Sequence, residues 1–440
     1  NPIGGQWSFT YNSEHVLQGI TNPRSKTKSL AYQNGKVVSS VLQGVSSGTQ
    51  YEYSQNTHTT IVTDPDGTKL HYRFDDYGQL TGMFDNLYEW IQFDYDNNNP
   101  TQTLRMYNQD QDPVSAAVYD SNQNVSKLFD LMGEKYQYTY TSTGKIASST
   151  DREGKTTTIT WDATESLPVK VIDALGREVV YEYDTNKNLV KIKTPYKTGE
   201  TSDIQFEYDS NGYVKKITNA LGKISEYTYN NCGDLTTEKN PEGKITTYTV
   251  NKMGSITKIT GPTPDNREVF YTYDANQNIT EFKNQRGYST YYEYNDRDLL
   301  TSIKNTLNQY TYYSYNASGK LVNIKDHKNN QTTIEYDNFG RESKIISNDG
   351  KFKQTLYDGL GRVSGYKDNL NNESKITYDL LYRPIETETP EGAKVKYEYD
   401  KEGHVKKVID PLNRQTTYDY DNCYQVTKVT NNAGKYSTIE

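Results

Sequence analysis

Residues 208–229 read YDSNGYVKKITNALGKISEYTY and contain one full copy of a 21-residue repeat that decides the fold. Tyr208 and Tyr229 hold equivalent positions, which we call anchors. Twenty anchors run from Tyr11 to Tyr420, and fifteen of the nineteen intervals between them are 21 residues long, whereas the other four are longer. Self-similarity at a fixed period of this length is typical of an architecture in which each copy packs only against its neighbours.

Each copy predicts two β-strands and two turns. Aromatic residues two positions apart, such as Tyr227 and Tyr229, lie on the same face of a strand. Asp or Asn follows the anchor and Gly comes four positions after it, as in Gly212, which predicts a turn with one residue at positive φ. A second turn recurs before the anchor, as in Asn240-Pro-Glu-Gly243. We expect strands of about six or seven residues and four-residue turns, read as type I turns followed by a left-handed residue.

Two apolar positions in the second strand of each copy do not follow strict alternation. Leu189 and Ile192 are three residues apart, as are Val214 and Ile217. A β-bulge would bring such a pair to one face, whereas a strand covered on both faces would not need one. The sequence leaves these two possibilities open.

The composition replaces aliphatic residues with tyrosine. Leu, Ile, Val and Phe together number 82 of 440 residues, a level at which disorder becomes a serious interpretation, but there are 42 tyrosines and the formal net charge is only −8. We expect the rings to make contacts across neighbouring strands while each hydroxyl reaches water or backbone, so that a chain poor in aliphatic residues still folds. A row of aromatic residues that stacks on sugars is the alternative role for these tyrosines.

Several classes of protein are excluded by simple counts. No apolar stretch approaches the 18 to 20 residues of a membrane helix, and the first thirty residues lack the order of a signal peptide. Cys232 and Cys423 are far apart, which argues against a disulfide scaffold or a cysteine zinc site. With 49 basic and 57 acidic residues, nucleic-acid binding is not expected.

The residues that define the repeat are its predicted structural site. They are the anchors, the carboxylates that follow them and the turn glycines: Tyr183, Asp184, Tyr208, Asp209, Gly212, Tyr229, Gly233, Tyr273, Tyr294, Tyr315, Gly319, Tyr336, Gly340, Tyr357, Gly361, Tyr399, Gly403 and Tyr420.

The core Tyr-Asp-x-x-Gly-x-Leu pattern resembles the YD repeat of RHS proteins. It is seen in Tyr208-Asp-Ser-Asn-Gly-Tyr-Val214 and in Tyr399-Asp-Lys-Glu-Gly-His-Val405. That family includes bacterial polymorphic toxins, cocoon-forming components of toxin complexes, wall-associated proteins and animal teneurins. The resemblance covers essentially the whole chain and implies a long β-sheet that spirals into a shell, often around a C-terminal toxin. The D-P-x-G-L element that marks the plug and the cleavage point in that family is not found here.

The fold class that we predict is all-β. Tandem antiparallel β-hairpins of about 21 residues form a long curled or spiralling sheet, an open shell or solenoid, because strand twist accumulates along the sheet. We expect residues 1–440 to be a single continuous array of about twenty repeats, truncated at both ends. The predicted partners are the neighbouring repeats and a cargo domain of the parent chain.

Motifs that could carry chemistry fit the repeat better than they fit a site. Gly44-Val-Ser46-Ser-Gly48 matches a nucleophile elbow but precedes a strand instead of a helix. The five histidines show no metal-binding spacing, and the segment that begins at Asp94 opens like a calcium loop but lacks its glycine and final glutamate. We therefore predict no catalytic, cofactor-binding or metal-binding residues. The insertions around Thr194–Glu200, Gly261–Asn266 and Asn97–Asp112 are candidates for recognition loops.

Two functions follow from this interpretation. The first is a non-catalytic structural segment of a large secreted or cell-surface bacterial protein, located outside the cell or in the cell wall, whose shell or stalk encapsulates or displays a toxin or effector domain. The alternative is an adhesion module that binds carbohydrate or a surface receptor. Neither function involves nucleic acid or insertion into a membrane.

Overall fold

The structure is a computed structural model that describes most of the chain. It covers residues 7–22, 25–43, 47–84, 89–96, 99–107, 113–130, 133–197, 200–262, 265–359 and 361–438. Among these residues there are 41 β-strands in one sheet and no helix, so the predicted all-β class is confirmed. No helix in this part of the chain could span a membrane.

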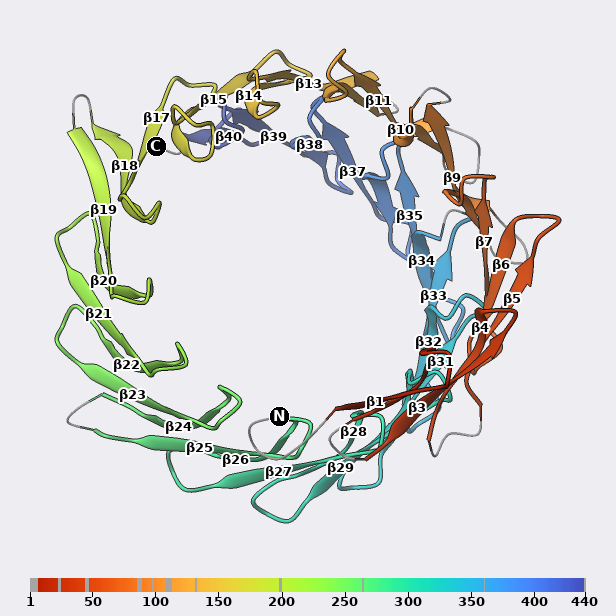
Figure 1. Ribbon diagram of the computed structural model, residues 1–440. Helices are drawn as coiled ribbons and strands as arrows, with labels where there is room; N and C mark the ends of the chain where they lie inside the picture. The colour runs from red at the N-terminus through yellow and green to blue at the C-terminus, as the bar shows by residue number, and fades with distance from the viewer. Residues whose placement is uncertain are drawn as a thin grey trace. The chain divides into compact units, whose positions relative to one another are not determined.

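The strands follow one another along the chain with short connections (Figure 1). The first nineteen are β1 (Ser8–Tyr11), β2 (Leu17–Thr21), β3 (Thr27–Gln33), β4 (Lys36–Leu42), β5 (Thr49–Ser54), β6 (Thr59–Thr63), β7 (Lys69–Phe74), β8 (Leu80–Phe84), β9 (Glu89–Asp96), β10 (Asn99–Tyr107), β11 (Pro113–Tyr119), β12 (Val125–Asp130), β13 (Gly133–Tyr140), β14 (Ile146–Asp151), β15 (Thr156–Trp161), β16 (Pro168–Ile172), β17 (Glu178–Tyr183), β18 (Leu189–Lys197) and β19 (Glu200–Tyr208).

The remaining strands are more uniform in length. They are β20 (Val214–Thr218), β21 (Ile224–Tyr229), β22 (Leu235–Lys239), β23 (Ile245–Val250), β24 (Ile256–Thr260), β25 (Glu268–Tyr273), β26 (Ile279–Lys283), β27 (Ser289–Tyr294), β28 (Leu300–Lys304), β29 (Tyr310–Tyr315), β30 (Leu321–Lys325), β31 (Gln331–Tyr336), β32 (Glu342–Ile346), β33 (Phe352–Tyr357), β34 (Val363–Asp368), β35 (Glu373–Tyr378), β36 (Pro384–Glu388), β37 (Lys394–Tyr399), β38 (Val405–Ile409), β39 (Gln415–Tyr420), β40 (Val426–Thr430) and β41 (Tyr436–Thr438).

A typical copy divides its 21 residues differently from the prediction. The strand β21 has six residues, β22 has five, and each is followed by a five-residue turn, at 230–234 and 240–244. The turns are one residue longer than expected because the first and fifth residues of the turn bond to each other: the Asn230 N–H donates to the Asp234 carbonyl oxygen at 2.9 Å. This additional pair closes a type I turn that is followed by a left-handed residue.

Pairing is antiparallel between strands that are consecutive in sequence, as expected for tandem hairpins. In the hairpin of β21 and β22, Tyr227 lies opposite Glu238 and Tyr229 lies opposite Leu235, with a register shift between them. The same shift precedes the anchor in most described copies, for example between β17 and β18 and between β37 and β38. The repeat therefore carries a β-bulge in most of its described hairpins, although β5 and β6 pair without one.

The β-bulge explains why the two apolar residues of the second strand are three positions apart. In the hairpin of β17 and β18, Tyr181 pairs with Ile192 and Tyr183 pairs with Leu189. Residues that lie opposite each other in an antiparallel pair project from the same face, so Leu189 and Ile192 share the face of the two tyrosines although they are three residues apart. One face of the sheet, which we call the tyrosine face, thus combines the anchors with aliphatic residues.

The other face is polar. Lys216 and Glu207 form an ion pair across one hairpin at 2.6 Å, and Lys239 and Glu226 form another at 2.6 Å. Hydroxyl pairs such as Thr228 and Thr237, 2.6 Å apart, occur between them. Opposite charges and hydroxyls directly across a strand pair are favourable cross-strand neighbours. This face is the charged, water-exposed side expected of an antiparallel sheet.

No hydrophobic side chain among the described residues is buried. The anchors and their aliphatic partners are half-buried, as the alternating pattern of β21 and β23 shows. A ring on one anchor also faces Leu or Val across the hairpin, not another ring, because the next anchor is two strands away, at about 10 Å. The expected contacts between rings across strands are therefore the minority, with Tyr271 and Phe282 at 5.2 Å as one example.

The chain forms two compact units, each made of two stretches of sequence. Unit 1 contains residues 1–73 and 205–352, and unit 2 contains residues 74–204 and 353–440. Within each unit the two stretches touch each other through their turns. Residues far apart in sequence therefore lie close together within each unit.

Candidate functional site

The anchor hydroxyl links each copy to the copy before it. Tyr229 Oη donates a hydrogen bond to the carbonyl oxygen of Val214, 15 residues earlier, at 2.8 Å. Val214 opens the strand that follows the preceding turn, and it lies opposite Tyr208 beside the bulge. A phenol has one apolar body and one polar tip, so it covers the strand while satisfying this carbonyl.

The same bond recurs along the chain. It joins Tyr183 to Pro168, Tyr273 to Ile256, Tyr315 to Leu300, Tyr336 to Leu321, Tyr399 to Pro384 and Tyr420 to Val405, with distances from 2.6 to 2.9 Å. Trp161 replaces tyrosine in one copy, and its indole N–H makes the equivalent bond to Ile146 at 2.9 Å. Burial raises the pKa of Tyr229 and Tyr420, which keeps the donating proton on the phenol.

The residue after the anchor organises the turn. Asp184 Oδ1 accepts the backbone N–H groups of Asn186 and Asn188, both at 2.9 Å. Asp209 does the same for Asn211 and Tyr213, at 2.8 and 3.0 Å. These bonds lower the pKa of Asp184, the bond from the Asn188 backbone contributing most. The carboxylates predicted to define the repeat are thus engaged in turn formation.

The predicted glycines occupy the left-handed position of these turns. Their φ angles are 85° at Gly212, 87° at Gly233, 86° at Gly319, 74° at Gly340, 79° at Gly361 and 101° at Gly403. Other copies place a side chain there, including His15 at 61° and Tyr424 at 61°. Tyr208, Tyr294 and Tyr357 end their strands in the same way as the other anchors.

The structure also forms contacts that the sequence analysis did not identify. We call the turn after each anchor the post-anchor turn and the turn before it the pre-anchor turn. The described post-anchor turns lie at one end of the strands and form the post-anchor rim, and the described pre-anchor turns form the pre-anchor rim at the other end. A seam is a place where the two rims meet.

The seam of unit 2 joins the pre-anchor turn 151–155 to the post-anchor turns 400–404 and 421–425. Figure 1 shows β14 and β15 beside β39 and β40. Arg152 Nη1 donates to the Lys401 carbonyl oxygen at 2.5 Å, and Nη2 contacts Asp130 Oδ1 at 2.5 Å. Only 9% of the Arg152 side chain and 13% of the Asp130 side chain are exposed. This is the most buried of the described ion pairs.

Tyr424 is the second element of this seam. Its hydroxyl donates to Asp151 Oδ2 at 2.6 Å, and the Lys155 ammonium lies 3.7 Å from the centre of its ring. The ring stacks on His404 at 4.4 Å. Burial and the neighbouring carboxylates, Asp151 above all, raise the pKa of Tyr424. An ammonium over a phenol ring combines charge attraction with ring contact.

Unit 1 has a smaller seam of the same kind. Lys26, in a pre-anchor turn, pairs with Asp296, in a post-anchor turn, at 2.8 Å. Asp66 receives the Lys320 ammonium at 3.4 Å, and its backbone N–H donates to Ser318 Oγ at 3.1 Å. In both units the partners are 249 to 273 residues apart, about twelve or thirteen lengths of the repeat.

One signal in the sequence could have pointed to the seam of unit 2. Tyr424 occupies the position where most copies have Gly, Asn or a short polar residue, and a bulky side chain at positive φ is uncommon. Such a residue is retained when contacts elsewhere compensate its backbone cost. The contact partners could not have been named, because nothing in the period relates Tyr424 to Asp151.

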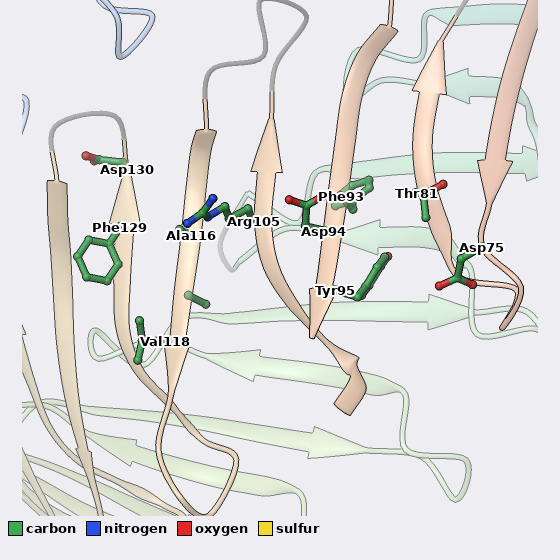
Figure 2. Close-up of a pocket in the computed structure, with 11 residues that line it drawn as sticks. Asp75, Thr81, Phe93, Asp94, Tyr95, Arg105, Ala116, Val118, Phe129 and Asp130 are labelled. Carbon is green, nitrogen blue, oxygen red and sulfur yellow. The ribbon is translucent and has the colours of Figure 1, made fainter. Parts of the chain in front are cut away.

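A groove of 1040 Å³ lies along β8 to β12 in unit 2 (Figure 2). Its lining combines aromatic, charged and small side chains from neighbouring strands: Asp75, Thr81, Phe93, Asp94, Tyr95, Arg105, Ala116, Ala117, Val118, Phe129 and Asp130. Ala117 stands where other copies carry an aromatic residue two positions before the anchor. The groove is therefore a local departure from the repeat.

The remaining sequence candidates stay apart from one another. Among the described residues, no three His, Cys, Asp or Glu side chains gather in a metal-binding arrangement. His404 contacts its own turn aspartate, Asp400, at 3.1 Å. Residues 44–46 of the elbow motif lie outside the described residues, as do parts of the three predicted recognition insertions, at 97–98 and 108–112, 198–199 and 263–264. Cys232 and Cys423 are free thiols.

Taken together, the period, the bulged hairpins and the anchor bonds define the class: a structural protein built of tandem β-hairpin repeats. The RHS repeat family model matches residues 208–249 and 399–436, which include the two copies quoted for the Tyr-Asp pattern. These two segments of the chain are therefore similar to the RHS repeat.

Individual relatives share limited sequence with this chain. Double-stranded DNA deaminase toxin A of Burkholderia cenocepacia (strain H111) is 25% identical over 166 residues, which are 38% of this chain and 10% of that protein. The Tc holotoxin pore of Photorhabdus luminescens matches with a TM-score of 0.47 and 12% identity, over 96% of this chain and 24% of that one. A crystal structure of TcdB2-TccC3 without its hypervariable C-terminal region matches at 0.45 and 12%, over 98% and 24%. The chain thus spans a quarter or less of these proteins.

Proposed function

We propose that this chain is a non-catalytic wall segment of a secreted or cell-surface bacterial RHS-repeat protein, and that its sheet encloses or displays a toxin or effector domain of the same parent protein. One observation carries the proposal. The sheet has a continuous tyrosine face, yet no described hydrophobic side chain is buried. A domain that folded only for itself would bury such a face against another layer.

The energetics point the same way. Lateral hydrogen bonds, anchor bonds and turn carboxylates hold each copy to the next, so the sheet is specified without a central core. The half-buried tyrosine face keeps apolar area that a second polypeptide can cover, at about 25 cal/mol for each Å² removed from water. The polar face with its Lys–Glu pairs suits solvent.

Protease protection tests the proposal. The chain would be expressed together with the segment that follows it in the parent reading frame, and that segment would be digested with trypsin alone and in the joined protein. We expect the joined segment to be protected and the 440-residue array to remain intact. Equal cleavage of the segment in both settings would contradict enclosure, and surface labelling would then test display.

A second candidate function, carbohydrate binding, is supported by the groove of unit 2. Phe93 and Phe129 offer rings, and Arg105 and Asp94 offer hydrogen-bonding groups, within one lining. Aromatic faces with a few polar groups are typical of sugar sites. A glycan array probed with the chain and with its Phe93→Ala/Phe129→Ala variant decides this point: binding that the variant loses would support it, and a blank array would remove it.

A further inference from the structure

The polar face of the sheet changes character along β25 to β30 in unit 1. In β21 the place three residues before the anchor holds Glu226, whose carboxylate pairs with Lys239 directly across the hairpin at 2.6 Å. Three later copies have an aromatic ring at the place of this glutamate: Phe270, Tyr291 and Tyr312. Each of them keeps a lysine across the hairpin, as Lys283, Lys304 and Lys325. We call these six residues the ring–lysine patch.

The register alternates rings and ammonium groups along the sheet, where β25 to β29 lie side by side (Figure 1). Tyr291 of β27 lies opposite Lys304 of β28, and Tyr312 of β29 lies opposite Lys325 of β30. Ser302, two residues before Lys304 in β28, lies opposite Tyr312, so the row continues from one hairpin to the next. Residues directly opposite each other project from the same face. A ring therefore recurs at every second strand, about 10 Å apart.

The rings of the patch are accessible to a ligand. Tyr291 is 42% exposed and Tyr312 is 46% exposed. The ring of Tyr310 stacks on Tyr312 with centres 5.5 Å apart and planes only 5° apart, which widens the flat surface. The Lys304 ammonium lies beside this surface, 5.7 Å from the centre of Tyr291 and 5.6 Å from that of Tyr310. Aromatic area and positive charge thus lie next to each other on an open face.

The lysines of the patch have no carboxylate partner. At the same place in other copies, Lys193 pairs with Glu182 and Lys239 pairs with Glu226. Within the part of the chain that the structure describes, no ion pair involves the three lysines of the patch. Carboxylates on this face are engaged by hydroxyl groups, as Glu293 is by Ser302 at 2.8 Å. A lysine stem that packs beside a ring leaves its ammonium in water, where it can meet an anion.

This combination fits a polymer of sugars that carries carboxylates. The apolar side of a sugar ring stacks on an aromatic ring, whereas an ammonium group attracts a carboxylate. Because rings and ammonium groups alternate from strand to strand, the patch matches a polymer in which uncharged and charged sugars alternate. Each contact is weak in water, but several contacts to one polymer reinforce one another.

Single-stranded nucleic acid is the other polymer that stacks on rings beside lysines. It carries a negative charge at every nucleotide, and its binding depends on an excess of basic groups. Glu268, Glu281 and Glu293 project from the same face among the members of the patch. The whole chain also has a formal net charge of −8. These carboxylates oppose a polyphosphate more strongly than a polysaccharide with a charge on alternate sugars.

We propose that the ring–lysine patch is a binding site for an acidic polysaccharide that lies across β25 to β30. The site is distinct from the groove of unit 2, and it lies on the face opposite the tyrosine face. It requires neither a cargo domain nor the groove. Failure of the proposed function would therefore leave this site untouched, and the reverse also holds.

Isothermal titration calorimetry of the full chain with hyaluronan oligosaccharides tests the proposal, because charged and uncharged sugars alternate in hyaluronan. We expect binding that weakens as salt is added. The triple variant K283Q/K304Q/K325Q should bind at least about tenfold more weakly and lose most of the salt dependence. The control K216Q/K223Q/K239Q removes the same charge from ion-paired lysines of unit 1 outside the patch and should leave binding unchanged.

The rings are tested separately from the charges. Tyr291→Ser with Tyr312→Ser should also weaken binding at least about tenfold, whereas Tyr291→Phe with Tyr312→Phe keeps the stacking surface and should retain it. Circular dichroism checks that each variant keeps its strands. Chitin oligosaccharides, which are uncharged, and oligo(dT) serve as competing ligands.

Four results would each overturn the proposal. The first is a chain that does not bind hyaluronan, and the second is a lysine variant that binds it as tightly as the unaltered chain. The third is equal affinity for chitin oligosaccharides, which would leave the lysines without a role. The fourth is tighter binding of oligo(dT) than of hyaluronan, which would identify the patch as a surface for nucleic acid.

Discussion

Tyr229 and Tyr424 are both half-buried tyrosines whose hydroxyls donate short hydrogen bonds, yet their acceptors lie 15 and 273 residues away in sequence. Tyr229 bonds a backbone carbonyl of the preceding copy, and this bond recurs in copy after copy. Tyr424 bonds a carboxylate in the seam of unit 2, with an ammonium and an imidazole against its ring. The anchor network is therefore a property of the repeat, whereas the seam is a property of one place.

The anchor bonds and the seam also differ in how much stability is lost when one of their contacts is removed. Each anchor bond is a modest hydrogen bond between neutral groups. Because each copy contacts only its neighbours, the stabilising contributions of these bonds add up along the array. The seam concentrates charged groups where little water reaches them, so the loss of one partner leaves another uncompensated. We therefore expect single substitutions in the seam to have larger local effects than equivalent substitutions in the anchor network.

The largest effect is expected from Arg152→Met. It leaves Asp130 without its guanidinium in a place where both side chains are largely buried, and removing one partner of a buried pair costs about 3 kcal/mol or more. Hydrogen exchange of the amides in turns 151–155 and 400–404 measures the local free energy of opening. Arg177→Met, which removes an ion pair with a 42% exposed guanidinium, is the control and should change opening by less than about 1 kcal/mol. Equal effects of the two would contradict the special weight of the seam.

Removing an anchor ring should come next. Tyr229→Ala deletes a half-buried ring and its hydrogen bond, for which we expect a loss of about 2 kcal/mol in the exchange protection of β20 and β21. Tyr229→Phe keeps the ring and should cost about 1 kcal/mol. Tyr291, 42% exposed and with no anchor bond, provides the comparison through Tyr291→Ala. A Phe variant as damaged as the Ala variant would show that the hydroxyl, not the ring, is the main contributor.

The features that the repeat encodes are predictable from the sequence, whereas the contacts outside the repeat are not. Tyr208, Asp209 and Gly212 specify strand end, turn carboxylate and left-handed residue within a few positions of one another, so local stereochemistry suffices to read them. The sequence left open whether a β-bulge explains the spacing of Leu189 and Ile192, and only the strand register shows that it does. The local spacing also predicted four-residue turns, whereas the turns have five residues. The hydrogen bond that joins the first and fifth residues is formed by backbone atoms, so no side chain in the sequence indicates it.

The seam of unit 2 is a different case. Arg152 lies in a turn position where copies vary freely, so nothing in the sequence separates a residue that contacts a distant turn from one that contacts water. Which rims meet depends on how far the sheet turns per copy, and this is set by small increments of strand twist summed over many strands. The bulky Tyr424 in a glycine position departs from the repeat visibly, but Tyr382 does so as well, at φ 63°, so this signal alone does not single out the seam.

Substitutions at the left-handed position of the post-anchor turn are expected to have a smaller effect on stability. The effect should be destabilising in one copy and stabilising in another. Gly212 has φ 85° and open space around it, so Gly212→Ala adds backbone strain without a clash, which we expect to cost about 1 kcal/mol. Lys187 holds the equivalent position at φ 67°, and Lys187→Gly should relieve a similar strain. Thermal melting of the two variants gives the signs. A loss of stability in both would mean that the Lys187 side chain, 3.2 Å from Ser166 Oγ, contributes more than its backbone costs.

The smallest predicted effect is a pH dependence confined to the seam of unit 2. Burial raises the pKa of Glu402, and Asp151 and Glu153 raise it further against the opposing influence of Arg152. One of its carboxyl oxygens, Oε1, has no hydrogen-bond partner among the described residues. A carboxyl whose pKa is raised on folding contributes stability that is complete below its unfolded pKa of 4.5 and is lost as the pH rises through the folded value.

Acidification from neutral pH toward 4.5 should therefore strengthen the seam before it weakens it. Asp400 acts in the opposite direction: burial alone would raise its pKa, but hydrogen bonds from the His404 backbone and ring lower it, so its contribution is lost only as the pH falls through a value below 3.8. Hydrogen-exchange protection of turn 400–404 should therefore pass through a maximum at a pH between the titrations of Glu402 and Asp400. The Glu402→Gln variant should lose the increase in protection on acidification from neutral pH but keep the decrease at lower pH. The seam of unit 1, where Lys26 and Lys320 face Asp296 and Asp66, is the comparison. We expect no rise at turn 316–320, and a parallel rise there would place the titrating group elsewhere.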